Sequence, residues 1–190
     1  MKNKTTLILI ILTVVVIAGT AVLYNAFGDK VALDLQQSSG DIQAVSDAEY
    51  DTQKKADDFT VYAADGEAVR LSDFAGKPVI VNFWASWCNP CKSEMPAIQE
   101  MWEKYGDKVE FLIVNLVDNA SETVASAQKF LATTDYTFPV YFDTQQDAAY
   151  TYSVYSIPTT LFVDAEGNLV QRFSGAMSHT ALETFITEIL

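Results

Sequence analysis

The feature that most constrains the fold of this chain is an apolar run from Val79 to Trp84, which only Asn82 interrupts. An unbroken run of this length is expected of a strand buried at the centre of a sheet, because a half-exposed strand would alternate polar and apolar residues. A helical spacing of apolar residues follows over Pro90 to Tyr105, and a second buried run follows over Val109 to Leu116. Strand and helix patterns that alternate in this way indicate an α/β sheet.

The remaining patterns add hairpins and helices to this sheet. Turn residues stand between short apolar runs at Asp65-Gly66 and at Glu166-Gly167-Asn168, as expected of two hairpins. Ser121 has the residue type of an N-cap and opens a predicted helix that ends at Thr134. We therefore predict a mixed sheet of about five strands with helices on both faces. The further predicted segments are strands over 59–63, 68–71, 140–142, 160–163 and 169–173, and helices over 146–152 and 178–190.

An uncharged, largely apolar segment near the N-terminus predicts a membrane anchor. It runs from Thr5 to Gly28 and reaches the roughly 20 residues that a helix needs to cross the hydrocarbon. Lys2 and Lys4 should stay on the cytoplasmic side, which places the remaining chain outside the cytoplasm. We expect residues 1–28 to form a single transmembrane helix in the cell membrane. A cleaved signal peptide is the alternative, because Gly19-Thr20-Ala21 offers small residues for cleavage.

The segment 29–56 is acidic and poor in apolar residues. Such a stretch buries too little surface to offset the entropy lost on ordering, so we expect a flexible tether. A short amphipathic helix around Ile42 to Tyr50 is the alternative reading. The folded domain is then expected over residues 57–190.

Charge and cysteine content exclude several classes of function. The net charge of −13 argues against nucleic acid as a partner, because phosphate binding needs a basic face. The chain has two cysteines, Cys88 and Cys91, and one histidine, His179. This is too few ligands for a zinc site and too few cysteines for a disulfide scaffold. Haem attachment would need a histidine directly after Cys91, and Lys92 stands there. We expect neither a metal nor a bound cofactor.

The two cysteines stand between the central strand and the helix that follows it. A helix N-terminus offers free amide groups and a partial positive charge, both of which favour a thiolate. The thiolate is the nucleophile in thiol–disulfide exchange. We therefore expect Cys88 to be the outer, attacking thiol, partly exposed, and Cys91 to be the shielded thiol that resolves the mixed disulfide.

The stretch from Phe83 to Cys91 resembles the active site of the thioredoxin superfamily, with Pro96 at the place of its helix-kinking proline. The segment 156–162 resembles the cis-proline loop and the strand that follows it. The resemblance implies a thioredoxin-like fold with a cis Ile157–Pro158 bond beside the dithiol. It also implies that the Ile157 backbone pairs with an extended substrate chain. We assign substrate binding to Trp87, Asn89, Pro90, Ile157 and Pro158.

Over residues 57–190 the chain is similar to the TlpA/ResA-like branch of membrane-anchored extracytoplasmic oxidoreductases. In that branch a glutamate lies three residues after the second cysteine, as Glu94 does here. The chain departs from ordinary thioredoxin at Asn82, which stands where thioredoxin has a buried aspartate. Because an amide cannot take up a proton in that role, Glu94 becomes the third candidate catalytic residue and the expected proton carrier. Its pKa should be raised by burial near Trp84 and Trp87.

The expected activity is disulfide reduction on exported proteins, apocytochrome c being one substrate that the resemblance suggests. Asn89 and Pro90 contain no cation that would favour the thiolate, which points to a reductant. We expect a membrane electron donor as partner and a monomeric protein. A disulfide-forming oxidase and a non-enzymatic tethered binding module remain as alternatives. A thiol peroxidase is disfavoured, because Ser86 and Trp87 precede Cys88 in place of the peroxidatic proline and threonine pattern.

Overall fold

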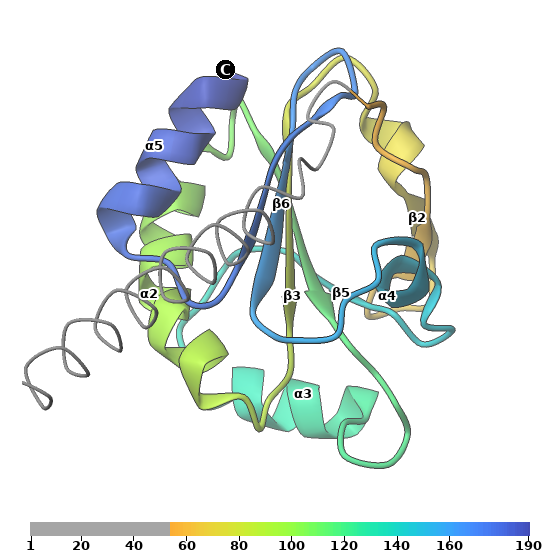
Figure 1. Cartoon of the computed structure of the whole chain (residues 1–190). Helices are drawn as coiled ribbons and strands as arrows, with labels where there is room; N and C mark the ends of the chain where they lie inside the picture. The colour runs from red at the N-terminus through yellow and green to blue at the C-terminus, as the bar shows by residue number, and fades with distance from the viewer. Residues whose placement is uncertain (1–53) are drawn as a thin grey trace, which may run out of the picture. The chain divides into compact units, whose positions relative to one another are not determined.

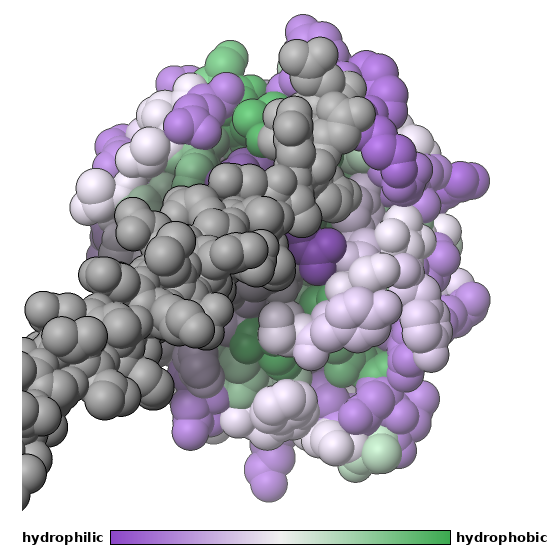
Figure 2. Space-filling model, in the orientation of Figure 1, coloured by the Kyte–Doolittle hydropathy of each residue, from purple (hydrophilic) through white to green (hydrophobic). Residues whose placement is uncertain are grey.

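A computed structural model describes residues 54–190 of the chain (Figure 1). The predicted membrane anchor over residues 1–28 and most of the predicted tether lie outside the described residues. Within residues 54–190, no helix is both long enough and apolar enough to cross a bilayer. Hydrophilic residues dominate the outline of the domain on the face shown in Figure 2.

The architecture is a mixed sheet with the predicted apolar run at its centre. That run forms β3 (Val79–Trp84), and all of its residues are buried. β3 pairs in parallel with β4 (Glu110–Asn115) and antiparallel with β6 (Thr159–Val163). The strand order is β2-β1-β5-β4-β3-β6-β7, and β7 (Leu169–Ser174) forms one edge.

The sheet has seven strands, so the predicted count of about five is too low. The N-terminal hairpin, β1 (Thr60–Tyr62) and β2 (Ala68–Arg70), accounts for the difference. It joins the same sheet because Tyr62 pairs with Phe142 of β5 (Val140–Phe142). Each strand was predicted individually, but its partner strand depends on contacts far apart in the sequence.

Helices cover both faces of the sheet, as predicted. α2 (Asn89–Tyr105) and α5 (His179–Ile189) lie on one face, and α4 (Asp147–Thr151) with the short 3-10 helix η1 (Leu71–Phe74) lies on the other (Figure 1). Alternate residues of β3 serve the two cores: Ile80 and Trp84 pack towards α2, whereas Val81 and Phe83 pack in the cluster that includes α4. Asn82 therefore shares the α2 face of the sheet.

The helix predicted over 121–134 is shorter, and its N-cap is not Ser121. α3 spans Val124–Leu131, and the Thr123 hydroxyl accepts the amide of Ser126 as its cap. The carboxylate of Asp118 accepts the backbone N–H groups of three following residues, Ser121 among them. Ser121 is thereby held in the turn before the helix, where it cannot cap it.

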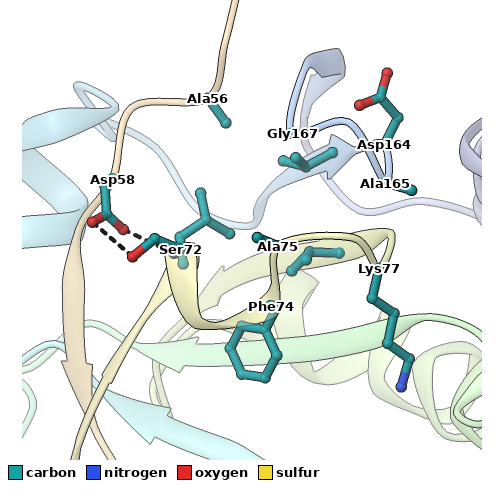
Figure 3. Close-up of a pocket in the computed structure, with 12 residues that line it drawn as sticks. Ala56, Asp58, Ser72, Phe74, Ala75, Lys77, Asp164, Ala165 and Gly167 are labelled. Atoms are coloured by element: carbon teal, nitrogen blue, oxygen red, sulfur yellow. Dashed lines mark hydrogen bonds between the residues drawn. The ribbon is translucent and has the colours of Figure 1, made fainter.

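The first described residues, 54–58, lie at the end of the sheet opposite the dithiol. Asp58 accepts hydrogen bonds from the amide and hydroxyl of Ser72 beside a cavity of about 100 Å³ (Figure 3). The Ala56 amide donates to the Gly167 carbonyl, so backbone pairing of the domain already includes residues 54–56. Val79 also lines this cavity and begins β3, whereas the cysteines follow the other end of that strand.

Candidate active site

The dithiol lies where β3 ends and α2 begins. Cys88 is the N-cap of α2, and its sulfur accepts the backbone amide of Cys91 at 3.2 Å. Cys88 and Cys91 form a disulfide. In the reduced protein the same amide and the positive end of the helix dipole would stabilise a thiolate on Cys88. The geometry supports Cys88 as the nucleophile.

The two sulfurs differ in exposure less than predicted. Cys91 is fully buried, and Cys88 is only 3% exposed although we expect it to be partly exposed. The carbonyl oxygen of Ile157 lies 3.7 Å from the Cys88 sulfur and covers it. Asn89 and Pro90, between the cysteines, are exposed, and Trp87 is 56% exposed. A substrate would therefore meet Trp87, Asn89 and Pro90 around a recessed sulfur.

The cis-proline loop reaches the dithiol through the pairing of β3 with β6. Phe83 lies opposite Thr159 in that pairing, so the residues just before β6 stand beside the residues just after β3. The Ile157–Pro158 peptide bond is cis, as the resemblance implies. Pro158 is buried and Ile157 is half-buried. The structure thus brings together the cysteines and the predicted substrate-binding residues, from segments about 70 residues apart in the chain.

Glu94 is buried beneath the dithiol helix, with 3% of its surface exposed. Its carboxylate accepts hydrogen bonds from Asn82 Nδ2 and from the backbone amide of Met177, each at 2.9 Å. Burial raises the pKa of the Glu94 carboxyl, and the two hydrogen bonds only partly oppose that shift. Burial, the predicted cause, is thus present, and the polar partners of the carboxylate are Asn82 and Met177. The apolar residues that share a small pocket with Glu94 include Ile98 and Phe111, whereas the predicted neighbours Trp84 and Trp87 do not line that pocket.

Asn82 links Glu94 to the cis-proline strand. Its Nδ2 donates both to Glu94 and to the hydroxyl of Thr160, two residues after Pro158. Its Oδ1 is buried and has no hydrogen-bond partner among the described residues. Rotation of the amide would offer this oxygen to a protonated Glu94, which then becomes a donor. Asn82 and Glu94 thus form one buried, hydrogen-bonded pair.

An apolar groove next to Cys88 was not predicted. It encloses about 470 Å³, and Tyr155 at its border is 94% exposed. Trp87 and Tyr155 are two of the four large apolar side chains that are exposed within residues 54–190, and both line this groove. The sequence gives little sign of it, because its residues come from three separate loops and from α4. Its apolar lining comprises Trp87, Leu116, Val117, Ala149, Val154, Tyr155 and Ile157.

Glu122 is a second buried carboxylate, and no motif in the sequence indicates it. Its carboxylate accepts from the amide and hydroxyl of Ser86, and from Asn115 Nδ2. Ser86 stands two residues before Cys88. No spacing rule connects Glu122 to the cysteines, since they meet only through the folded sheet. Within residues 54–190, no cluster of acidic, histidine and cysteine side chains could hold a metal ion.

Comparison with known proteins identifies the family. The model of the AhpC/TSA family matches residues 52–172. A protein named thiol-disulfide oxidoreductase ResA, from Bacillus thuringiensis subsp. konkukian, is 35% identical over 137 residues, covering 72% of this chain and 77% of that protein. The thioredoxin-like protein YneN of Bacillus subtilis is 36% identical over 130 residues, covering 68% and 75%. The chain belongs to this family of thioredoxin-like thiol–disulfide oxidoreductases.

Solved structures agree with this assignment. The exposed lipoprotein thioredoxin Etrx1 of Streptococcus pneumoniae is 34% identical, with a TM-score of 0.62, over 70% of this chain and 99% of that one. StoA from Bacillus subtilis is 27% identical, with a TM-score of 0.60, over 69% and 97%. The chain is an enzyme that exchanges thiols and disulfides through a CxxC pair, and disulfide-bearing proteins are the substrates that this family implies.

The raised pKa of Glu94 predicts a pH dependence of stability. The folded state binds the Glu94 proton more tightly than the unfolded state, in which the pKa of the carboxyl has its ordinary value of 4.5. This contribution to stability is therefore full below the unfolded pKa and declines as pH rises through the folded pKa, by about 1.4 kcal/mol for each pH unit between the two values. Glu94→Gln removes the titration. Urea unfolding of both oxidised proteins should show the variant gaining stability relative to wild type as pH rises, and a constant difference would contradict the prediction.

Proposed function

We propose that this protein reduces disulfides of exported proteins outside the cytoplasm while its N-terminal segment anchors it in the membrane. The observation that carries the proposal is the Cys88–Cys91 disulfide at the N-terminus of α2, with the Ile157 carbonyl 3.7 Å from the outer sulfur. The Ile157 carbonyl beside a nucleophilic sulfur suits an extended peptide that carries a disulfide, because such a peptide can pair with this backbone. The groove next to Cys88 adds an apolar surface for the substrate's neighbouring side chains.

The reaction follows from the two positions of sulfur. The Cys88 thiolate attacks one sulfur of the substrate disulfide, and the other substrate sulfur leaves as a thiolate. Cys91, deprotonated in its turn, attacks the Cys88 sulfur and releases the second substrate thiol. Two electrons pass to the substrate, and Cys88 and Cys91 end as the disulfide that the structure contains. A membrane electron donor would restore the dithiol.

The surroundings of the dithiol support the reducing direction. Strong oxidants of this class hold the reduced form by stabilising its thiolate. Here the residues between the cysteines, Asn89 and Pro90, contain no cation. The residue after Cys91 is a cation, Lys92, but its ammonium group makes a cation–π contact with Phe130, at 5.8 Å from the centre of the ring. The equilibrium potential of the cysteine couple against glutathione distinguishes the reductase from an oxidase of the same fold.

Glu94 is the proposed proton carrier for Cys91. It lies on α2 close to one turn after Cys91, is buried, and has a raised pKa. A carboxyl group whose pKa is raised can take a proton from a thiol and return it later. A thiolate nearby would favour the protonated form further, so the two groups should titrate as a pair.

Trapping of the substrate tests the roles of the cysteines. Cys91→Ala removes the resolving thiol, so mixed disulfides through Cys88 should accumulate and be visible by non-reducing electrophoresis and mass spectrometry. Cys88→Ala is the matched variant and should trap little, because the remaining thiol is fully buried. Partners trapped mainly on Cys91 in the Cys88→Ala protein would reverse the assignment.

Replacement of Glu94 tests proton transfer. Glu94→Gln should keep the fold and slow disulfide exchange by about a hundredfold, the lower end of the range for lost general acid–base catalysis. The alkylation rate of the reduced protein, followed against pH, should also change its midpoint, because the carboxyl no longer titrates with the thiols. Superimposable profiles for wild type and variant would leave proton transfer to water.

Localisation tests the anchor. The full chain should sediment with membranes and keep residues 1–28, because that apolar segment is long enough to span the hydrocarbon. Protease added to intact cells or spheroplasts should reach the catalytic domain. Mature protein whose N-terminal sequence begins near Val22 would show cleavage and release instead.

A further inference from the structure

The loop that carries Cys88 is held by a carboxylate from a different part of the chain. The Cys88 amide donates to the Ala85 carbonyl, which makes residues 85–88 a turn with Ser86 and Trp87 at its centre. Glu122 Oε1 accepts the Ser86 amide at 3.0 Å, and Glu122 Oε2 accepts the Ser86 hydroxyl at 2.7 Å. The backbone amide and the hydroxyl of Ser86 therefore both donate to the carboxylate of Glu122.

Glu122 is itself held firmly. It is only 1% exposed, and Asn115 Nδ2 donates to its Oε1 at 2.8 Å. Asn115 ends β4 and lies opposite Trp84, the last residue of β3. The backbone of Glu122 is fixed as well, because its amide donates to the Asp118 carboxylate and its carbonyl accepts the amides of Asp118 and Asn119. The Glu122 carboxylate is thus fixed next to the end of β4, and from there it hydrogen-bonds to the turn at Ser86.

The hydrogen bonds of this network favour the turn at Ser86, even though one polar atom of the network has no partner. Asn115 Oδ1 is buried without a hydrogen-bond partner among the described residues, which is a cost that folding tolerates while the Asn115 amide serves Glu122. Among residues 54–190, the salt bridges found do not include Glu122. The carboxylate is held by neutral donors alone, and two of its three side-chain hydrogen bonds go to Ser86.

We propose that Glu122 is a positioning residue for the dithiol: by holding Ser86, it fixes the Cys88 sulfur and the Trp87 side chain relative to the cis-proline loop. The inference rests on the proposed disulfide exchange, since its purpose is to align the attacking sulfur. In-line attack on a disulfide is sensitive to such alignment, and a displacement of about 1 Å can cost about a hundredfold in rate.

The chemistry of the side chain offers a conservative variant. In Glu122→Gln the amide oxygen can still accept from Ser86 N–H and Asn115, and the amide nitrogen can donate to the Ser86 hydroxyl, which also accepts. Glu122→Ala loses all three hydrogen bonds. Thr123→Ala is the matched control, because it removes the N-cap of α3 next door and leaves the contacts of Ser86 in place.

The experiment measures three quantities for each full-length variant. They are kcat and KM for reduction of an oxidised disulfide peptide, the alkylation rate of Cys88 in a Cys91→Ala background, and the thermal midpoint. Glu122→Ala should lower kcat about tenfold to a hundredfold with a smaller change in KM, and should slow Cys88 alkylation. Glu122→Gln should recover most of both rates. Thr123→Ala should lower the thermal midpoint and leave both rates unchanged.

Several outcomes would overturn the proposal. Wild-type rates in Glu122→Ala, no recovery in Glu122→Gln, or equal slowing by Thr123→Ala would each do so. Should Glu122→Ala fail to fold, Ser86→Ala removes a single hydrogen bond at a half-exposed residue and should slow both rates several-fold; an unchanged rate would overturn the proposal. If the wild-type protein reduces no disulfide, the proposed function fails, whereas the alkylation rates of Cys88 still decide whether Glu122 positions it.

Discussion

The pairing of β3 with its two neighbours is the constraint on which the rest of the site depends. Because β3 runs parallel to β4 and antiparallel to β6, the end of β3, the end of β4 and the start of β6 meet at one edge of the sheet. That edge receives Cys88 from the loop after β3, Glu122 from the loop after β4, and Pro158 from the loop before β6. The strand pairing brings these three loops side by side, although they lie far apart in the sequence. The ends of the strands are therefore what assembles the chemistry, and β3 can serve this purpose because it is buried on both faces.

The alternation of side chains along β3 decides which groups meet beneath the dithiol. Asn82 and Trp84 point to the face that α2 covers, and Glu94 projects from α2 into the same space. The result is a carboxylate whose partners are an amide and a backbone N–H, in apolar surroundings that raise its pKa. A one-residue change of register in β3 would move Asn82 to the α4 face and leave Glu94 buried without this partner. The hydrogen bond between Asn82 and Glu94 therefore depends on the register of β3.

Local signals explain what could be predicted from the sequence. The buried run at Val79, the turn residues and the cysteines at a strand-to-helix junction each act over a few residues, and they indicated every strand and the site itself. The strand count was too low because the joining of Tyr62 to Phe142 is a long-range contact. Ser121 has the residue type of a cap, but Asp118 accepts its amide and Thr123 caps the helix instead. Glu122 was missed for the same reason as the groove at Tyr155: neither has a spacing relation to Cys88, and both reach it only through the sheet.

The electrostatics of the site follow from how its two buried carboxylates are satisfied. Glu94 and Glu122 both accept hydrogen bonds from neutral donors, and among the described residues neither takes part in the salt bridges found. A carboxylate that carries its charge near the dithiol would oppose the formation of a thiolate at Cys88. The opposing influence is the N-terminus of α2, through the Cys91 amide that faces the Cys88 sulfur. The helix end thus assists the Cys88 thiolate, whereas a charged carboxylate opposes it, and the proposed reducing direction depends on the second effect.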